Sequence, residues 1–301
     1  MQEKKEKILM FNKTWDMKDE GDFTIPIVDG FELTTEQRFM DEAIAVIFHM
    51  PTLSLADIQL IRHKKKAGQF WVFWSMECEA HYSWQSEPEI LGLFDIKATY
   101  KFDSDIVVPY LYPNYQELLR RASIPKTGFI NAFISSSFDL SGRYKYLKEL
   151  MNYVAVDSYG KTLKNKTIPQ DSGENSKLEL IAGYKFSLAF ENARAHDYVT
   201  EKLYQPLIAG SVPVYLGASN VEDFAPGEKC FINVDKFATV KAAADYLLEL
   251  ANNEEEYNRF LKWKTEPFRK EFNDKMEAVK LHPLKRLCKV IEDKVAMTKF
   301  Q

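Results

Sequence analysis

The sequence predicts an α/β protein built from two domains, each with a parallel sheet and helices. Three observations support this class. Short apolar runs alternate with helical patterns in both halves of the chain. Residues 184–217 have the pattern of a strand, a polar loop, a helix and a second strand, and such βαβ units form parallel sheets. A chain of 301 residues is also long enough for two domains of about 150 residues.

In the first half, apolar runs rich in β-formers predict strands, and helical periodicity predicts the segments between them. The expected strands are 8–11, 43–48, 70–74 and one ending near Val108, and the expected helices are 55–66 and one within 110–124.

In the second half the alternation restarts, and residues 157–177 are polar enough to predict a surface loop. The expected strands are 128–134, 154–156, 184–190 and 212–216, and the expected helices are 144–153, one starting near Val199, 240–250 and 254–264.

The helix within 184–217 has an apolar residue at every fourth position, which gives it one buried face. These residues are Val199, Leu203 and Leu207. Gly210 is placed to end the helix. Pro206 lacks a backbone N–H, so we expect a kink in the later part of the helix.

The polar loop before this helix predicts a nucleotide-diphosphate site. In a right-handed βαβ unit the loop lies at the carboxyl edge of the sheet, where α/β proteins bind ligands. A helix start supplies free N–H groups and a positive dipole end, which suit phosphate. The loop and helix start carry Glu191, Asn192, Tyr198, Thr200, Glu201 and Lys202.

Composition excludes several classes of protein. A net charge of −4 gives no reason to expect a nucleic-acid partner. The three cysteines, Cys78, Cys230 and Cys288, are widely spaced and form no CxxC pair. This argues against a disulfide framework or a zinc site and fits a reducing compartment. The N-terminal apolar run is too short for a signal peptide, and no stretch approaches the ~20 apolar residues of a spanning helix.

The motifs YKFSLAFEN, YVTEK and VPVYLG follow one another within residues 184–217. In order and spacing they resemble the C-terminal signature of the α1,3/1,4-fucosyltransferase family. The resemblance implies the GT-B fold, in which two Rossmann-like α/β domains face each other across a cleft. We place an acceptor-binding domain at 1–127 and a GDP-fucose-binding domain at 128–280. Eukaryotic members carry a membrane anchor and stem, so we expect a bacterial, cytoplasmic form or a trimmed chain.

Transfer of fucose with inversion needs one general base near the acceptor and stabilisation of the departing diphosphate. The buried strand within 70–82 (FWVFWSMECEAHY) leads directly to Glu77. This segment resembles the family's strand ending in a Met-Glu-Ser or Gly-Glu-Asn pattern, so Glu77 is the expected catalytic base. The chain continues with Cys78 and Glu79 where the family usually has Ser or Asn. Glu79 therefore remains a competitor.

Residues 93–113 resemble a second family block and contain Asp103, Ser104 and Asp105. A DxD triplet holds manganese in other glycosyltransferases, but the family motif is not a metal ligand set. We expect this triplet to form a turn that holds a strand at 106–108. No other His, Asp or Glu cluster has metal-ligand spacing. We therefore expect no metal and no cofactor beyond the GDP-fucose donor.

The segment 133–150 resembles the loop that opens the family's donor domain and places Arg143 on its diphosphate-binding arginine. A guanidinium can hold two phosphate oxygens in a fork. The resemblance further implies that Lys202 neutralises the diphosphate. The remaining expected donor-binding residues are Tyr198 and Asn192 on the phosphate oxygens, Glu201 on the ribose hydroxyls, Ser136 as a hydroxyl contact, and Glu191 without a defined role.

Residues 280–301 carry six Lys or Arg against two acids and form an apolar helical stripe. The stripe consists of Leu284, Leu287, Cys288, Ile291 and Val295. We expect the helix at 281–301 to pack back on the N-terminal domain. Weak peripheral contact with a membrane is the alternative, because basic amphipathic helices bind membrane surfaces.

The predicted protein is an inverting α1,3-fucosyltransferase that moves L-fucose from GDP-fucose to a 3-hydroxyl of GlcNAc or Glc. The expected acceptors are galactoside- and GlcNAc-containing glycans of the N-acetyllactosamine or lactose type, which would give Lewis-type products in oligosaccharide biosynthesis or protein glycosylation. An α1,4-fucosyltransferase and an enzyme of the same fold using another nucleotide sugar are the enzymatic alternatives. An inactive glycan-binding module is the alternative of a different class.

Overall fold

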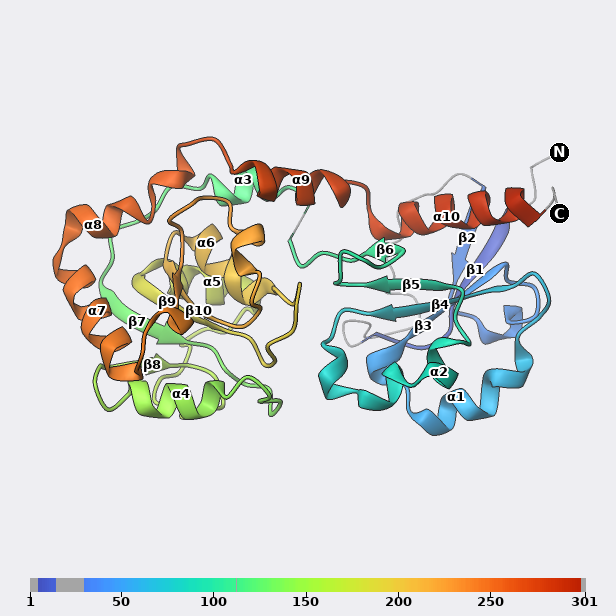
Figure 1. Ribbon diagram of the computed structural model, residues 1–301, viewed down its shortest axis with the longest axis horizontal. Helices are drawn as coiled ribbons and strands as arrows, with labels where there is room; N and C mark the ends of the chain where they lie inside the picture. The colour runs from blue at the N-terminus through green and yellow to red at the C-terminus, as the bar shows by residue number, and fades with distance from the viewer. Residues whose placement is uncertain (1–4, 15–29, 112, 299–301) are drawn as a thin grey trace. The chain divides into compact units, whose positions relative to one another are not determined.

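The computed structural model describes residues 5–14, 30–111 and 113–298 and shows two compact α/β units (Figure 1). Unit 1 comprises Met1–Val108 and Val279–Gln301, and unit 2 comprises Pro109–Ala278. The predicted boundary between the domains follows residue 127. In the structure the boundary follows Val108, and residues 109–127 belong to unit 2. One cause is the buried Lys264, whose Nζ donates to the carbonyl of Leu119 at 2.7 Å.

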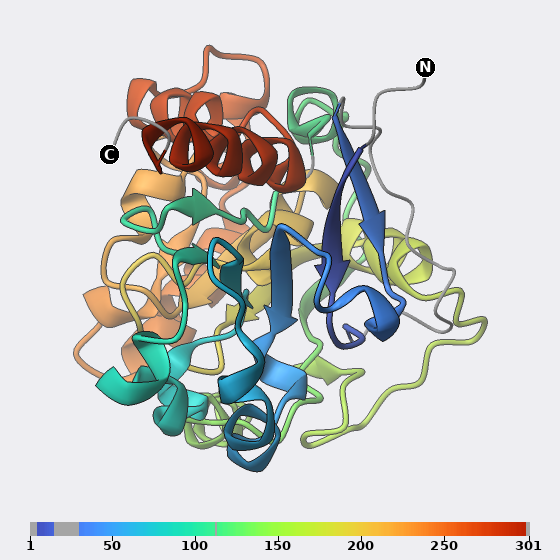
Figure 2. The ribbon, with the colours of Figure 1, turned by 90° about the vertical axis from the view of Figure 1, so that its right-hand side faces the viewer.

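Within the described residues, unit 1 contains a parallel sheet in the order β2-β1-β3-β4-β5-β6. Alternate residues face opposite sides of a strand, so the two faces pack separately. Ile47 and Val72 face α10 (Pro283–Thr298), and Phe48 and Trp71 face α1 (Leu55–Ile61) and α2 (Pro88–Leu91) (Figures 1 and 2). The strands are β1 (Glu6–Met10), β2 (Phe31–Thr34), β3 (Ala45–His49), β4 (Phe70–Ser75), β5 (Ile96–Thr99) and β6 (Ile106–Val107).

The C-terminal helix α10 packs on the sheet of unit 1. Four residues of its predicted apolar stripe, Leu284, Leu287, Cys288 and Ile291, are buried in the core, and Val295 packs against them. Burying each leucine or isoleucine side chain contributes about 1.5–3 kcal/mol. The stripe is therefore covered by the sheet in this structure and is not presented to a membrane surface. No helix in the described part of the chain is long and apolar enough to span a membrane.

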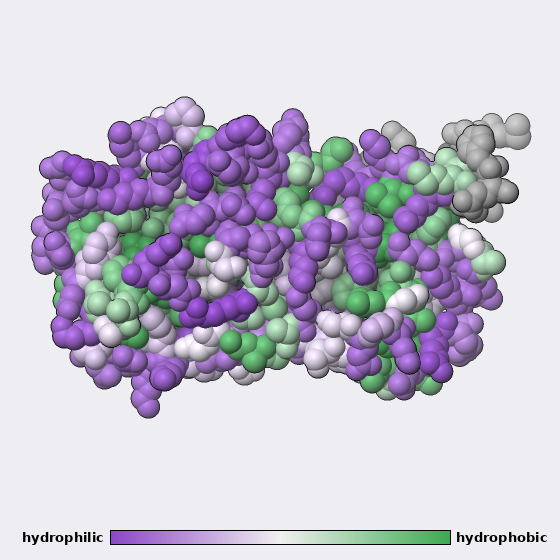
Figure 3. All heavy atoms as spheres, viewed as in Figure 1, coloured by the Kyte–Doolittle hydropathy of each residue, from purple (hydrophilic) through white to green (hydrophobic). Residues whose placement is uncertain are grey.

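Unit 2 contains a parallel sheet in the order β11-β10-β9-β7-β8 among the residues described. The strands are β7 (Gly128–Ala132), β8 (Asp157–Ser158), β9 (Tyr184–Phe190), β10 (Val212–Leu216) and β11 (Ile232–Asn233). The helices are α3 (Tyr115–Leu119), α4 (Arg143–Leu150), α5 (Glu174–Ala182), α6 (Glu201–Ala209), α7 (Val240–Asn252), α8 (Glu254–Arg259) and α9 (Lys270–Ala278). The buried side of α7 joins the core, and the surface at this end of unit 2 carries both hydrophilic and hydrophobic residues (Figure 3).

The strand order of unit 2 contains a topological switch point. From β7 the chain moves one way to β8, and it then crosses back to place β9 on the other side of β7. Loops that leave the carboxyl ends of β7 and β9 therefore diverge and leave a crevice, which is where open α/β sheets bind ligands. All the predicted donor-binding residues lie on these two loops or on the helix starts that follow them.

The predicted strands 184–190 and 212–216 match β9 and β10. Gly210 ends α6 with φ +73°, as predicted. The helix continues past Pro206 to Ala209, so the later part of the helix, which Pro206 placed in doubt, is present.

Other segments differ from the prediction. Residues 154–156 are not a strand, and the segment 157–177 contains β8 and the first turn of α5. Sequence reasoning missed β8 because it is a short, polar edge strand. Ser158 is held by side-chain hydrogen bonds, with its N–H donating to Asn165 and its hydroxyl to the carbonyl of Thr162.

Candidate active site

Glu191 fixes the start of α6. It follows β9 directly, and its side chain is fully buried. Its carboxylate accepts hydrogen bonds from the N–H of Thr200 at 2.8 Å and from the Thr200 hydroxyl at 2.8 and 3.0 Å. Thr200 is the N-cap of α6, and its hydroxyl accepts from the N–H of Lys202 at 3.4 Å. Glu191, for which no role was predicted, therefore positions the helix that carries Glu201 and Lys202, the predicted donor-binding pair.

Lys202 lies between two carboxylates. Its Nζ is 3.4 Å from Glu191 and 3.0 Å from Glu201, and it donates to the Thr200 hydroxyl at 2.9 Å. We call these four residues the Lys202 cluster. Burial alone would lower the pKa of Lys202, but the two carboxylates raise it overall. Lys202 is therefore a charged ammonium whose charge is already partly compensated within the fold.

The two carboxylates of the Lys202 cluster have opposite pKa shifts. Burial raises the pKa of Glu191, and this outweighs the attraction of Lys202 and the hydrogen bonds from Thr200. Burial also acts to raise the pKa of Glu201, but Lys202 and Lys177 lower it overall. Glu201 therefore stays ionised near neutral pH and can accept hydrogen bonds from a ligand hydroxyl.

Gly217, the last residue of the VPVYLG motif, leaves room for the Lys202 cluster. A Cβ at this position would lie 2.4 Å from the Tyr215 hydroxyl and 2.6 Å from Cγ of Glu191. The backbone of β10 and the loop after it can therefore approach Glu191 only because this residue has no side chain.

Arg143 stands at the first position of α4 and is 1% exposed. Its guanidinium donates to three backbone carbonyls, those of Phe190 at 3.3 Å, Ser136 at 3.0 Å and Phe138 at 2.8 Å. Its Nε is buried without a partner among the described residues. In this arrangement Arg143 ties the loop after β7 to the end of β9, and only part of its fork remains for a phosphate. Its predicted role on the diphosphate stays a prediction.

The remaining predicted donor residues lie on the loops that follow β7 and β9. Asn192 is nearly buried, and its Oδ1 has no hydrogen-bond partner among the described residues. Tyr198 is also buried and packs edge-on against the ring of Tyr110. Ser136 is exposed on the loop after β7, and its hydroxyl accepts from the N–H of Phe138 at 3.3 Å. The fold thus gathers all seven predicted donor residues at one edge of unit 2.

Unit 1 holds the predicted base in a pocket of about 230 Å³, which we call the Glu77 pocket. Glu77 follows β4 and is half-buried. Burial, with a smaller effect of Glu77, raises the pKa of Tyr82 to about 12. The pocket is lined by Phe73, Ser75, Glu77, Glu79, Gln85, Ser86, Leu91, Lys97, Thr99, Tyr100, Lys101, Asp103 and Ser104.

The structure distinguishes the two acids of this pocket. Glu79 forms an ion pair with Lys101 at 2.5 Å and accepts a hydrogen bond from the Tyr100 hydroxyl. Burial acts to raise the pKa of Glu79, but these two partners lower it overall. Sequence reasoning did not identify Tyr100 and Lys101 as site residues. The signal was available, because both lie in the 93–113 block.

The Asp103-Ser104-Asp105 triplet forms a turn between β5 and β6. Asp105 accepts a hydrogen bond from the N–H of Lys97 at 2.7 Å, and the hydroxyls of Ser104 and Thr99 contact each other. Among the described residues, no group of three or more His, Cys, Asp or Glu side chains is placed to hold a metal ion.

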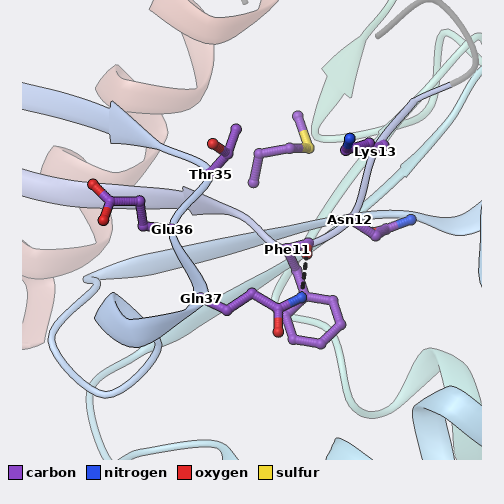
Figure 4. A pocket seen from close by; sticks show the side chains of 7 residues that line it. Phe11, Asn12, Lys13, Thr35, Glu36 and Gln37 are labelled. Atoms are coloured by element: carbon purple, nitrogen blue, oxygen red, sulfur yellow. Dashed lines mark hydrogen bonds between the residues drawn. The ribbon is translucent and has the colours of Figure 1, made fainter. Parts of the chain in front are cut away.

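A larger hollow of about 510 Å³ lies at the carboxyl ends of β1 and β2 in unit 1 (Figure 4). The Gln37 amide donates to the carbonyl of Phe11 at 3.0 Å. Asn12 donates to the carbonyl of His49 and to Thr52. These polar side chains hold the fold together, so the hollow gives no independent indication of a ligand.

Comparison with known proteins identifies the family. Residues 124–301 match the model described as glycosyltransferase family 10 (fucosyltransferase) C-term, and residues 3–111 match fucosyltransferase, N-terminal. The chain is 36% identical over 238 residues to GDP-fucose protein O-fucosyltransferase 3 of Xenopus tropicalis, covering 73% of this chain and 50% of that protein. It is 34% identical over 251 residues to human 4-galactosyl-N-acetylglucosaminide 3-alpha-L-fucosyltransferase FUT6, covering 80% and 67%. The chain thus spans about half the length of the O-fucosyltransferase relatives it matches.

The fold also matches a solved structure. A crystal structure of alpha1,3-fucosyltransferase with GDP-fucose superimposes with a TM-score of 0.60 at 18% sequence identity, covering 92% of this chain and 89% of that one. This likeness confirms the predicted α/β fold of the GT-B class with two parallel sheets. The chain belongs to glycosyltransferase family 10, the fucosyltransferases.

Proposed function

We propose that the chain is an inverting α1,3-fucosyltransferase that uses GDP-fucose as donor. One observation carries the donor side of the proposal. The carboxyl edge of the unit 2 sheet carries a charged lysine, an ionised carboxylate and an unpaired buried amide oxygen on the loop after β9 and the start of α6. These groups suit, in turn, a diphosphate, the hydroxyls of a ribose and a hydrogen-bond donor of the ligand.

On the donor side, Lys202 and Arg143 neutralise the diphosphate, and Glu201 accepts from the ribose hydroxyls. Asn192, Tyr198 and Ser136 complete the contacts. At an effective dielectric of about 20, a cation 4 Å from a phosphate charge contributes up to ~4 kcal/mol before desolvation. Part of the Lys202 charge is already balanced by its two carboxylates. Its net attraction for the diphosphate is correspondingly smaller.

On the acceptor side, Glu77 is the general base. Glu79 is the weaker choice because Lys101 and Tyr100 hold its carboxylate and lower its pKa. A carboxylate that is stabilised in its ionised form takes up a proton less readily. Glu79 and Lys101 then serve to shape the Glu77 pocket.

The proposed reaction is a single displacement. Glu77 takes the proton of the acceptor hydroxyl as that oxygen attacks C1 of fucose. The bond from C1 to the β-phosphate oxygen breaks, its electron pair leaves with GDP, and the configuration at C1 inverts. Two cations around the diphosphate stabilise the charge that develops on the leaving group.

Transfer assays test the proposal. The protein is incubated with GDP-fucose and N-acetyllactosamine or lactose, and the linkage in the product is assigned by NMR. GDP-mannose and UDP-galactose serve as donor controls, and each assay is repeated with EDTA and with manganese. We expect an α1,3-linked product from GDP-fucose alone that EDTA does not suppress. GDP binding without transfer to any acceptor would instead support an inactive module.

A second candidate is transfer of fucose to a serine or threonine hydroxyl of a polypeptide. The 36% identity to a protein named GDP-fucose protein O-fucosyltransferase 3 favours it. The two candidates share the donor site and the base and differ only in the acceptor. Folded protein domains offered beside N-acetyllactosamine separate them, because label in the protein and none in the sugar would select O-fucosylation.

A further inference from the structure

Lys177 is a second lysine at the edge of the candidate donor site, and the sequence motifs do not include it. It stands on α5. The C-terminal end of α5 lies at the amino edge of the sheet, so the helix begins at the carboxyl edge. At the amino edge the Gly183 carbonyl accepts from the N–H groups of Thr127 and Gly128, at the start of β7. Lys177, in the first half of α5, therefore lies on the same side as the switch point.

Side-chain neighbours place Lys177 beside the Lys202 cluster. Lys177, Lys202 and Phe133 line the same narrow cavity. The Lys177 ammonium is 5.4 Å from the centre of the Phe133 ring, which directly follows β7. The cavity is only about 10 Å³, which is room for about one water. It shows that these side chains are neighbours, while a nucleotide would lie at its mouth.

The fold provides few interaction partners for the Lys177 ammonium. Across the described residues it forms no hydrogen bond and no ion pair within 4 Å. Its interactions are the ring contact with Phe133 and electrostatic effects of Glu201, Glu174 and Lys202. Burial lowers its pKa, with smaller effects of Glu201 and Glu174, which raise it, and Lys202, which lowers it. Lys177 is half-buried. A partly desolvated ammonium with no hydrogen-bond acceptor in the fold gains stability when a ligand supplies one.

The charges around Lys202 also favour a role for Lys177 in ligand binding. Glu191 and Glu201 both face Lys202, so Lys202 alone does not make the cluster positive. Arg143 adds one positive charge but donates to three carbonyls of its own loop. A diphosphate needs further positive charge here. The nearest acid on α5, Glu174, is exposed to solvent and accepts a hydrogen bond from Gln205.

We propose that Lys177 binds the diphosphate of the nucleotide-sugar donor as a third cation, opposite Lys202. The proposal rests on the proposed function only in taking GDP as the nucleotide. The alternative is that Lys177 merely positions Glu201, whose pKa it helps to lower. Binding of GDP and of guanosine separates these two roles, because both ligands contain the ribose but only GDP carries phosphate charge. Direct binding of the diphosphate by Lys177 affects GDP alone, whereas positioning of Glu201 affects both ligands.

The test is calorimetric binding of GDP and of guanosine to wild type, Lys177→Gln and Lys177→Arg. The matched control is Lys126→Gln. Lys126 is also a half-buried lysine whose pKa is lowered by burial, to about 8, and it donates to the carbonyl of Ala182 at the opposite end of α5. Thermal melts of all variants establish that each is folded.

We expect Lys177→Gln to weaken GDP about 10- to 100-fold, as for a lost charged hydrogen bond. We further expect unchanged guanosine affinity, Lys177→Arg within a few-fold of wild type, and Lys126→Gln equal to wild type. Equal losses for guanosine and GDP, or no loss for GDP, would overturn the proposal. If Lys177→Gln does not fold, a large GDP loss in Lys177→Arg overturns it. Absence of GDP binding by wild type would instead refute the proposed function.

Discussion

The Lys202 cluster of unit 2 and the Glu77 pocket of unit 1 differ in how completely the fold fixes their polar groups. In the Lys202 cluster, a fully buried carboxylate, a helix cap and a lysine form one closed network. In the Glu77 pocket, Glu79 is held by Tyr100 and Lys101, while Glu77 is half-buried at the end of β4. The comparison indicates that the fold fixes the Lys202 cluster in place, and that in the Glu77 pocket it fixes Glu79 through Tyr100 and Lys101.

The largest expected effect is on the base. Glu77→Gln removes the carboxylate that accepts the proton, and we expect kcat to fall by about 10²- to 10⁴-fold, the usual contribution of general base catalysis. Steady-state assays with GDP-fucose and N-acetyllactosamine measure it. The matched variant Glu79→Gln should lose far less, since Glu79 is bound to Lys101. A larger loss in Glu79→Gln would exchange the two roles.

The next largest effect is expected at Lys202. Lys202→Met removes a preorganised cation at the leaving group, and we expect a loss of about 10²-fold in kcat/KM for GDP-fucose. The exposed Lys241→Met, on α7, serves as the control. Unchanged kinetics in Lys202→Met, with an unchanged melting temperature, would remove Lys202 from the donor site.

Gly217→Ala tests whether the Lys202 cluster is as tightly packed as the distances indicate. The new Cβ would overlap the Tyr215 hydroxyl and Glu191, and we expect a loss of about 1–3 kcal/mol in the free energy of unfolding. At Gly183 a Cβ would meet its nearest atoms at 3.5 and 3.8 Å, so Gly183→Ala is the control. Urea titrations compare them. Equal stability of both variants would show that the cluster is loosely packed.

The smallest effect concerns pH. The pKa of Glu191 is raised in the folded protein, so the folded state binds its proton more tightly than the unfolded chain does. Its contribution to stability is therefore fully present below about pH 4.5 and decreases as pH rises from there through the folded pKa. In the variant Glu191→Gln, residue 191 has no ionisable group, so this pH dependence is removed.

Urea titrations at pH 4.5, 6 and 7.5 measure this difference. Relative to wild type, Glu191→Gln should gain stability as pH rises across this range. The exposed Glu254→Gln should show no such trend. A trend of opposite sign would mean that attraction to Lys202, and not burial, dominates the pKa of Glu191.

The sequence was most informative where the signal is local. Residues 184–217 contain β9, the loop, α6 and β10 in one continuous segment, so the strand bounds and the grouping of Glu191, Asn192 and Lys202 could be predicted together. The capping role of Glu191 could not, because it depends on a buried carboxylate meeting Thr200 across nine positions. Residue types alone also left the part of α6 after Pro206 in doubt, whereas in the structure Pro206 is buried and the helix continues past it.

Contacts between residues far apart in the chain could not be predicted from the sequence. The partners of Glu79 lie more than twenty positions away on the chain, and Lys177 meets Lys202 only because α5 packs beside α6. The strand β2 was missed because four residues with mixed polarity give little periodic signal. The three carbonyls that accept hydrogen bonds from Arg143 are brought to it by the loop conformation, which residue types do not specify.

The central claim is that unit 2 binds the donor and Glu77 acts only on the acceptor. Calorimetric titration of GDP into wild type, Glu77→Gln and Lys202→Met tests it most directly. We expect Glu77→Gln to bind GDP as wild type does and Lys202→Met to bind it at least tenfold more weakly. Weakened GDP binding in Glu77→Gln, or wild-type binding in Lys202→Met, would contradict the claim.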